Sequence, residues 1–187
     1  MSHEKKRNDN LQNDPAVREN ILKLANELLE ICHNDQDVNS QTMPRRIYAI
    51  DQLKSSLYVH IYENICNTEL IDKRWPTQSI EEEIHNVQAV IDSLSMDVLH
   101  EDLSHLTGEA ICGAFSKEDC VQTMEPDYVS IEYLLDILRC IHEWISSRLE
   151  STMENTINKT KSDKIEETTP SFEQIAPIQT DLPKLYF

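Results

Sequence analysis

Glycine is nearly absent from this chain: only Gly108 and Gly113 occur among its 187 residues. Glycine is the residue that most readily adopts the positive φ angles of tight turns, and an all-β fold needs many such turns. So few glycines therefore predict an all-α fold, a compact helical bundle with few hairpins. They also exclude Walker and Rossmann nucleotide sites, because those loops rely on glycine to bring several backbone amides close to a phosphate.

Two segments carry the signals of a helix N-terminus. Asp14 and Pro15 place a capping side chain directly before a proline in the first turn of a helix. Ser79 is followed three residues later by Glu82, which fits a capping box. We therefore expect helices that begin near residues 14 and 79.

Apolar residues recur at spacings of three and four, which is the period of one buried helix face. We expect helices over about residues 14–32, 45–67, 79–94 and 128–149, with a strand as the alternative in the second of these regions. A bend and a short helix are expected around residues 107–109. The expected core residues are Val17, Ile21, Leu24, Ala25, Leu28, Cys32, Ile47, Ile50, Leu53, Leu57, Ile61, Ile65, Ile84, Val87, Val90, Ile91, Leu94, Met96, Leu99, Leu103, Leu106, Ile131, Leu134, Leu135, Leu138, Ile141 and Ile145.

Polar segments separate these regions. Residues 33–44 and 113–127 are expected to be loops, and residues 69–78 an ordered connection that contains Trp75 and Pro76. Proline disfavours the α conformation of the residue before it, so Trp75 is not expected to be helical. We expect Trp75 to fill a gap between helices, with a role as an exposed contact for a partner as the alternative.

Both ends of the chain have compositions typical of disorder. Residues 1–13 are polar and charged, and residues 151–187 are rich in Thr, Lys, Glu, Pro and Asn without a helical stripe. We therefore predict disordered tails over residues 1–13 and 151–187, and one helical domain over residues 14–150. The apolar end of the second tail, Leu182 to Phe187, is a candidate peptide ligand.

Acidic residues dominate the second half of the predicted domain. The whole chain has a formal net charge of −17, and residues 79–150 contain sixteen acidic but only three basic residues. Such a surface repels nucleic acid, anionic membranes and the acidic tails of tubulin. It is either a solvated surface that keeps the protein soluble or one that selects a basic partner.

The chain has five cysteines, an odd number, and no C-x-x-C motif. This pattern indicates reduced thiols in a cytosolic protein. The first fourteen residues are polar, unlike a signal peptide, and no apolar run approaches the roughly 20 residues of a membrane span. We therefore expect a cytoplasmic protein that does not associate with membranes.

The sequence offers few candidates for chemistry. The residues best suited to zinc are His100, His105, Cys112 and Cys120. Their spacings differ from the tight pairs of structural zinc sites. Cys32 with His33, and Cys140 with His142, are too close along a helix to face each other as dyads. We expect no metal, no cofactor and no catalytic residue, and we keep an enzyme with an unrecognised Cys or carboxylate site as a remote alternative.

Two strings carry a resemblance to a known family. They are Glu-Ile-His-Asn-Val-Gln-Ala-Val-Ile-Asp-Ser-Leu at residues 83–94 and Leu-Ser-His-Leu-Thr-Gly-Glu at residues 103–109. They resemble the N-terminal domain of the family of the ninety-five-kilodalton centrosomal coiled-coil protein. Weaker likeness at residues 25–29 and 130–135 extends the resemblance over about residues 16–150.

The resemblance implies a divergent calponin-homology-like fold and a cytoskeletal setting at the centrosome or spindle pole, without catalysis. Two features depart from the family. The segment from Ser116 to Asp127 is longer than the family's turn before the last helix. The family continues into long coiled coils, whereas this chain ends in a Pro- and Thr-containing tail, which leaves a paralogue, an isoform and a fragment as open alternatives.

We therefore expect an adaptor or scaffold domain that binds a protein partner of the centrosome or cytoskeleton. The alternative is a direct microtubule or actin contact, which in calponin-homology-like domains generally uses a basic face. Because of the acidic charge, we expect weak or no microtubule binding. The candidate partner contacts are Arg45, Arg46, Lys54, Lys73, Arg74 and Trp75.

Overall fold

The computed structural model describes residues 14–34, 43–113, 115–116, 121–122 and 125–162. In chain order the elements are α2 (Pro15–Asn34), the short 3-10 helix η1 (Ile50–Gln52), α3 (Ser55–Cys66), α4 (Ile80–Ser93), the π-helix η2 (Leu94–Leu99), α5 (Gly108–Cys112), β1 (Phe115–Ser116), β2 (Val121–Gln122) and α6 (Tyr128–Ser162). Apart from the two-residue strands, every described element is helical, which confirms the predicted all-α fold. The chain divides into two compact units, residues 1–143 and 144–187.

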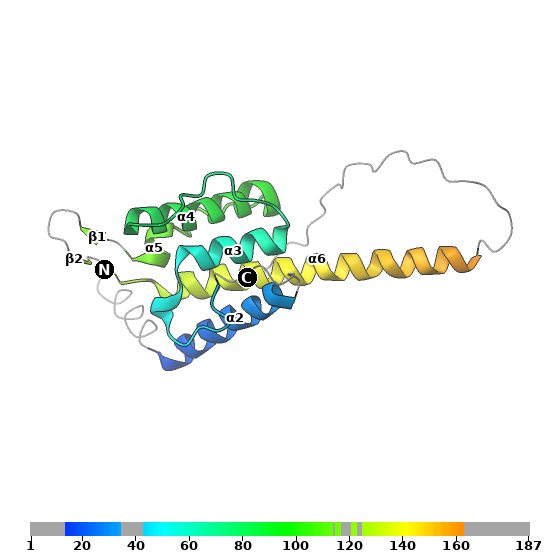
Figure 1. The fold of residues 1–187 in the computed structure, drawn as a ribbon, viewed down its shortest axis with the longest axis horizontal. Helices are drawn as coiled ribbons and strands as arrows, with labels where there is room; N and C mark the ends of the chain where they lie inside the picture. The colour runs from blue at the N-terminus through cyan, green and yellow to red at the C-terminus, as the bar shows by residue number, and fades with distance from the viewer. Residues whose placement is uncertain (1–13, 35–42, 114, 117–120, 123–124, 163–187) are drawn as a thin grey trace. The chain divides into compact units, whose positions relative to one another are not determined.

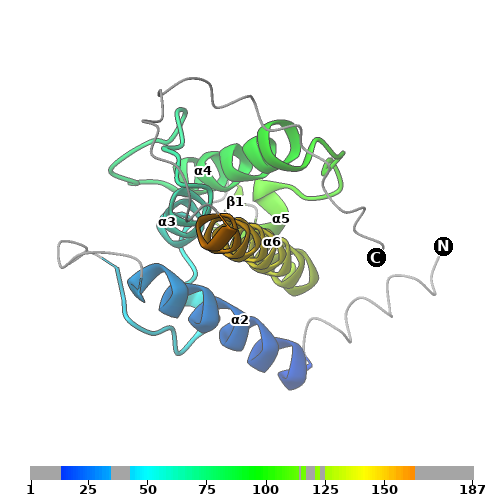
Figure 2. The ribbon, with the colours of Figure 1, turned by 90° about the vertical axis from the view of Figure 1, so that its right-hand side faces the viewer.

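In the first unit, the part of α6 up to Glu143 lies in the centre of the helical bundle. It is placed between α2 on one side and α4 and α5 on the other, with α3 alongside (Figure 1 and Figure 2). The side chains that α6 buries there are Ile131, Leu134, Leu135, Ile137, Leu138 and Ile141. This apolar stripe is the core against which the other helices pack.

Both predicted helix starts are confirmed. The Asp14 carboxylate accepts a hydrogen bond from the backbone N–H of Ala16 at 2.9 Å, so Asp14 caps α2 with Pro15 as its first helical residue. At α4, Ser79 Oγ accepts from the N–H of Glu82, and the Glu82 carboxylate accepts from the N–H of Ser79. This reciprocal pair is the predicted capping box.

The predicted helix start at residue 45 is wrong. The segment before η1 is not helical, and α3 begins only at Ser55. The side-chain amide of Asn26, on α2, explains the difference: its Oδ1 accepts from the N–H of Ile47 at 2.7 Å, and its Nδ2 donates to the Ile47 carbonyl at 2.9 Å. Ile47 is thereby held in the core without the helix that its spacing predicted, and no strand is described in residues 45–67.

The predicted bend and short helix after α4 are confirmed. His100, with φ of 55°, ends η2, and Thr107 caps α5. Gly108 begins α5 where the backbone of α5 meets α4: a Cβ at this position would lie 2.3 Å from the carbonyl oxygen of Ile84. The N–H of Gly108 also donates to Oε1 of Gln88 at 2.9 Å. Glycine here permits a close approach that no other residue allows.

The segment predicted as a loop over residues 113–127 contains the antiparallel pair β1 and β2, in which Phe115 is opposite Gln122.

The final helix continues beyond the predicted end at Leu149 to Ser162. The added residues contain neither glycine nor proline, so no residue in them strongly opposes a helix. No helix within the described ranges is long and apolar enough to cross a membrane.

Some predicted core residues are not buried. Val17, Ile50, Leu53, Ile84 and Ile145 are only partly buried, and Met96 is 70% exposed. Met96 faces solvent because the π-helical winding of η2 shifts the side-chain directions away from the period of an α-helix.

In the second unit, the guanidinium of Arg148 lies over the ring of Trp144, 4.4 Å from its centre. The predicted disorder is wrong for residues 151–162, which form the end of α6. The rest of the predicted tails, residues 1–13 and 163–187, lies outside the described residues.

Candidate protein-interaction surface

The connection between α3 and α4, residues 67–79, is held at its start by Glu63 of α3. We call this segment the α3–α4 loop. One carboxylate oxygen of Glu63 accepts from the N–H of Leu70 at 2.9 Å and from Nζ of Lys73 at 2.6 Å. Leu70 itself is buried. The first part of the loop is therefore fixed to α3 by a buried side chain and two hydrogen bonds to a charged group.

The second part of the loop is held by side chains of α4. Asn86, which is fully buried, accepts from the N–H of Arg74 at 2.7 Å and donates to the Arg74 carbonyl at 3.0 Å. His85 donates from Nε2 to the Asp72 carbonyl at 2.8 Å. The predicted ordered connection is thus confirmed, because its backbone is bonded to both flanking helices.

This anchored loop exposes two large apolar side chains. Ile71 is 98% exposed and Trp75 is 57% exposed. The expectation that Trp75 fills a gap between helices is therefore wrong. The loop passes along the surface of α4, and its anchors are Leu70 and the backbone of Arg74, which leaves Trp75 outside the core.

The six predicted contact residues do not lie together. Lys73, Arg74 and Trp75 belong to the α3–α4 loop, after the C-terminal end of α3, whereas Lys54 is the N-cap of α3. Twelve helical residues separate these two positions, which is about 18 Å along the helix axis. Arg45 and Arg46 lie in the exposed segment before η1.

The charges near the loop are mainly negative. Lys73 is within 2.6 Å of Glu63 and 3.1 Å of Glu69, and the hydrogen bond to Glu63 raises the pKa of Lys73. The carboxylate of Asp72 is 84% exposed and lies 3.3 Å from Nε2 of His85. The loop has two basic residues, Lys73 and Arg74. Lys73 is paired with Glu63 and Glu69, whereas Arg74 is exposed and takes part in none of these ion pairs.

Sequence reasoning selected Trp75 but missed Ile71, Glu63 and Asn86. Asn86 did leave a signal: it precedes Val90 by four residues, so it falls on the buried face of the predicted helix, where a polar residue needs a partner. Ile71 left none, because nothing in the pattern distinguishes an exposed isoleucine from the buried Leu70 beside it.

Cys66, Cys112 and Cys140 are partly buried, and this raises the pKa of each thiol. Burial raises the pKa of Cys66 to about 11, the pKa of Cys112 to about 12 and, to a smaller degree, the pKa of Cys140. An activated nucleophile requires the opposite shift. Within the described residues, no group of three or more His, Cys, Asp or Glu side chains is arranged to hold a metal ion. Cys120, one of the zinc candidates, lies outside the described residues.

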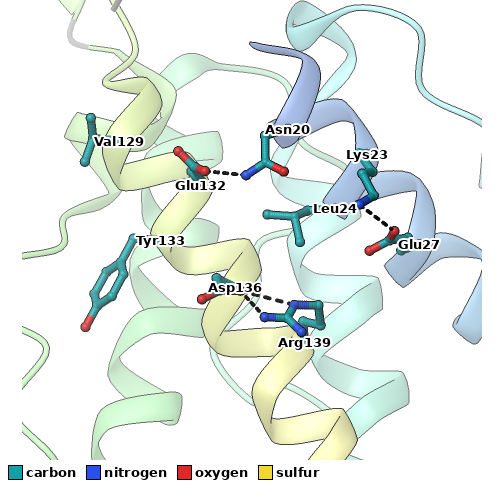
Figure 3. Close-up of a pocket in the computed structure, with 9 residues that line it drawn as sticks. All are labelled: Asn20, Lys23, Leu24, Glu27, Val129, Glu132, Tyr133, Asp136 and Arg139. Carbon is teal, nitrogen blue, oxygen red and sulfur yellow. Dashed lines mark hydrogen bonds and ion pairs between the residues drawn. The ribbon is translucent and has the colours of Figure 1, made fainter. Parts of the chain in front are cut away.

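One surface cavity lies between α2 and α6, with a volume of about 480 Å³ (Figure 3). Its polar side chains bind one another: Asn20 donates to Glu132, Arg139 donates twice to Asp136, and Lys23 lies 3.8 Å from Glu27. Another, smaller cavity of about 320 Å³ has a mixed lining that includes Lys54, Glu83 and Cys112. In the larger cavity these mutual contacts resemble a structural ion-pair network more than a catalytic arrangement.

Comparison with known proteins gives matches to two proteins and one family model. Residues 63–114, which include the α3–α4 loop, match the family described as "Domain of unknown function (DUF5745)". Centrosomal protein of 95 kDa from Rattus norvegicus is 30% identical over 134 residues, and the protein of that name from Mus musculus is 29% identical over 134 residues. No solved structure matches the chain significantly.

The match covers 72% of this chain but 14% of each relative, so the chain spans only a small part of their length. The predicted likeness to the ninety-five-kilodalton centrosomal protein is confirmed at this level, while the calponin-homology-like fold stays a prediction. Over 134 of its residues, this chain is homologous to a segment of centrosomal protein of 95 kDa.

Proposed function

We propose that this protein is a non-catalytic adaptor or scaffold domain that binds a protein partner at the centrosome or spindle pole. The observation that carries the proposal is the α3–α4 loop, which is fixed to two helices and yet exposes Ile71 and Trp75. Tryptophan is among the residues most often found at the energetic centre of protein interfaces. The homology to a centrosomal protein supports the cellular setting.

The proposed domain comprises residues 14–150, has a divergent calponin-homology-like fold and acts in the cytoplasm. The central helix and the short helix after it, which carry the resemblance, are present as α4 and α5. The tails over residues 1–13 and 151–187 are proposed to lie outside the folded domain. The raised thiol pKa values support a role without cysteine chemistry.

Localisation of the tagged full chain tests the cellular setting. We expect a focus that coincides with γ-tubulin in interphase and at the poles of mitotic spindles. The focus should persist after microtubules are depolymerised with nocodazole, because the proposed partner is a centrosomal protein and not the microtubule. A diffuse cytoplasmic signal at low expression would contradict the proposal.

A direct microtubule or actin contact is the second candidate function. Arg45 and Arg46 favour it, since both are exposed. Lys73 is already paired with two carboxylates, which weakens the basic surface that such a contact needs. Co-sedimentation with microtubules and with actin filaments at low salt tests this function. Binding that is abolished in the double variant Arg45→Glu, Arg46→Glu would establish it in place of the leading proposal.

A further inference from the structure

The α3–α4 loop exposes its apolar side chains in a fixed conformation. The backbone of Leu70, Asp72, Arg74 and Gln78 is hydrogen-bonded to side chains of α3 or α4. Ile71 and Trp75 alternate with these anchored positions. Their exposure is thus a property of an ordered loop, and a partner would not have to spend binding free energy on ordering it.

The two side chains are close enough for one partner to contact both. They are four positions apart, and even a fully extended chain of that length spans at most about 14 Å. A standard protein interface covers about 800 Å² on each partner, which is wide enough to include both residues. Ile71 and Trp75 can therefore belong to a single binding surface.

The charge around this surface defines the chemistry of its partner. Residues 63–86 contain six acidic and two basic side chains. The exposed fractions of the Glu69 and Asp72 side chains are 80% and 84%, whereas Lys73 is only 25% exposed and is held by Glu63 and Glu69. An apolar surface with exposed carboxylates beside it fits a segment that carries both apolar and basic side chains. The face of an indole ring also attracts Lys and Arg.

We propose that the α3–α4 loop is the partner-binding surface of this chain, and that it binds a segment of another protein in which apolar side chains are flanked by Lys or Arg. This inference rests on the proposed function, since it names the surface and the partner chemistry of the adaptor domain. Ile71 and Trp75 provide the apolar contact, and the carboxylates of Glu69 and Asp72 select the basic flanks.

Selection from a phage-displayed library of random 16-residue peptides on the full chain tests the proposal. We expect the enriched peptides to share one or two large apolar residues with Lys or Arg close to them. No enrichment, or enrichment of acidic peptides, would overturn the proposed chemistry.

The peptide enriched most strongly is then synthesised with a fluorescent label and titrated with variants of the full chain. Ile71→Asp and Trp75→Ala should each weaken binding by about tenfold or more, which is the range of interface hot spots. Both residues are exposed, so the variants should fold normally. Tyr48→Asp is the matched control, because Tyr48 is also an exposed apolar residue but lies next to Ile47, in the segment that Asn26 of α2 holds. Equal binding by all the variants would show that the loop is not the surface.

Two further measurements test the occupant of the loop and the cellular setting separately. Light scattering of the wild type over a range of concentrations tests a second copy of this chain as the occupant; a dimer that Ile71→Asp dissociates would overturn the proposal. Localisation of the wild type, compared with the peptide selection, separates the inference from the proposed function. If centrosomal foci persist in wild type but peptide selection fails, only the inference is wrong. If peptides are selected but no focus forms, the proposed cellular setting is wrong.

Discussion

Asparagine side chains hold extended backbone against helices at two places in this protein. Asn26 on α2 pairs with both the N–H and the carbonyl of Ile47, and Asn86 on α4 pairs with both groups of Arg74. The side-chain amide has a donor and an acceptor in one plane, so one residue replaces two backbone partners. A single side chain thereby fixes a segment that has no regular secondary structure of its own.

The prediction for Asn86 concerns this pairing. Asn86→Ala leaves two backbone groups of Arg74 without partners, which should lower the free energy of unfolding by about 1–3 kcal/mol. Urea denaturation followed by circular dichroism measures the change. Asn64→Ala, at a half-buried position of α3, is the control, because the Asn64 side chain makes no hydrogen bond within the described residues. It should change stability by less than about 0.5 kcal/mol. Similar effects of the two substitutions would show that Asn86 does not hold the loop.

The cysteines give a second prediction at the scale of single residues. The pKa of Cys66 is raised from 9.0 to about 11, so its thiolate fraction near neutral pH should be about 100-fold below that of an ordinary thiol. Cys66 and Cys112 should therefore react slowly with a disulfide reagent in the folded protein and rapidly in urea, as read by mass spectrometry of the modified peptides. Rapid modification of either one in the folded protein would contradict the raised pKa values of these thiols.

The same shifts predict how stability depends on pH. The folded protein retains the Cys112 proton up to about pH 12, whereas an ordinary thiol loses it near 9.0. The stabilising contribution is thus fully present below pH 9.0 and is lost as the pH rises through the folded pKa. Cys112→Ser should reduce the loss of stability between pH 9 and pH 11, and an unchanged loss would assign it to other groups.

The helices differ in how well their sequences specify them. The start of α4 was predictable, because a capping box is a local signal that involves only Ser79 and Glu82. The start of α3 was not, since the apolar period from Ile47 onward matches a helix and only a contact with Asn26, twenty-one residues earlier, prevents it. Local signals therefore located the starts of α2 and α4, whereas a contact between distant residues prevented the helix that the apolar period predicted at Ile47.

The packing of α5 on α4 gives the prediction at the scale of elements. Gly108→Ala places a Cβ 2.3 Å from the Ile84 carbonyl oxygen, so α5 has to move away from α4. Overpacking of this kind costs about 1–3 kcal/mol, and thermal denaturation should show it as a lower midpoint. Glu109→Ala is the control, because Glu109 is exposed one residue further along α5. A stability equal to that of wild type would mean that the two helices can separate without cost.

The candidate surface was predictable only in part. Tryptophan is common at interfaces, so Trp75 could be chosen from its residue type, and Lys73 and Arg74 beside it from their charge. The pairing of Lys73 with Glu63 and Glu69 could not be foreseen, because it depends on how the loop folds back on α3. The exposure of Ile71 has the same origin. The sequence therefore predicted the segment, and the fold decided which of its side chains a partner can reach.

At the scale of the whole molecule, every apolar side chain that is described as buried lies in the first unit. Among the described residues, the last one buried is Ile141, before the unit boundary at Glu143. Ser151, the last residue whose burial is described, is exposed. We therefore predict that a chain of residues 14–150 folds by itself, with one cooperative thermal transition at a midpoint close to that of the full chain.

A shorter chain that ends at Asp136 is the matched comparison. It lacks Ile137, Leu138 and Ile141, each of which is at most 3% exposed. Truncating one such side chain to alanine typically costs about 2–5 kcal/mol. The summed cost of losing all three is comparable to the total free energy of unfolding of many domains, which is about 5–15 kcal/mol. The chain that ends at Asp136 should therefore show no cooperative thermal transition. Loss of the transition in the 14–150 chain as well would show that later residues are needed for folding, and would contradict the proposed domain boundary.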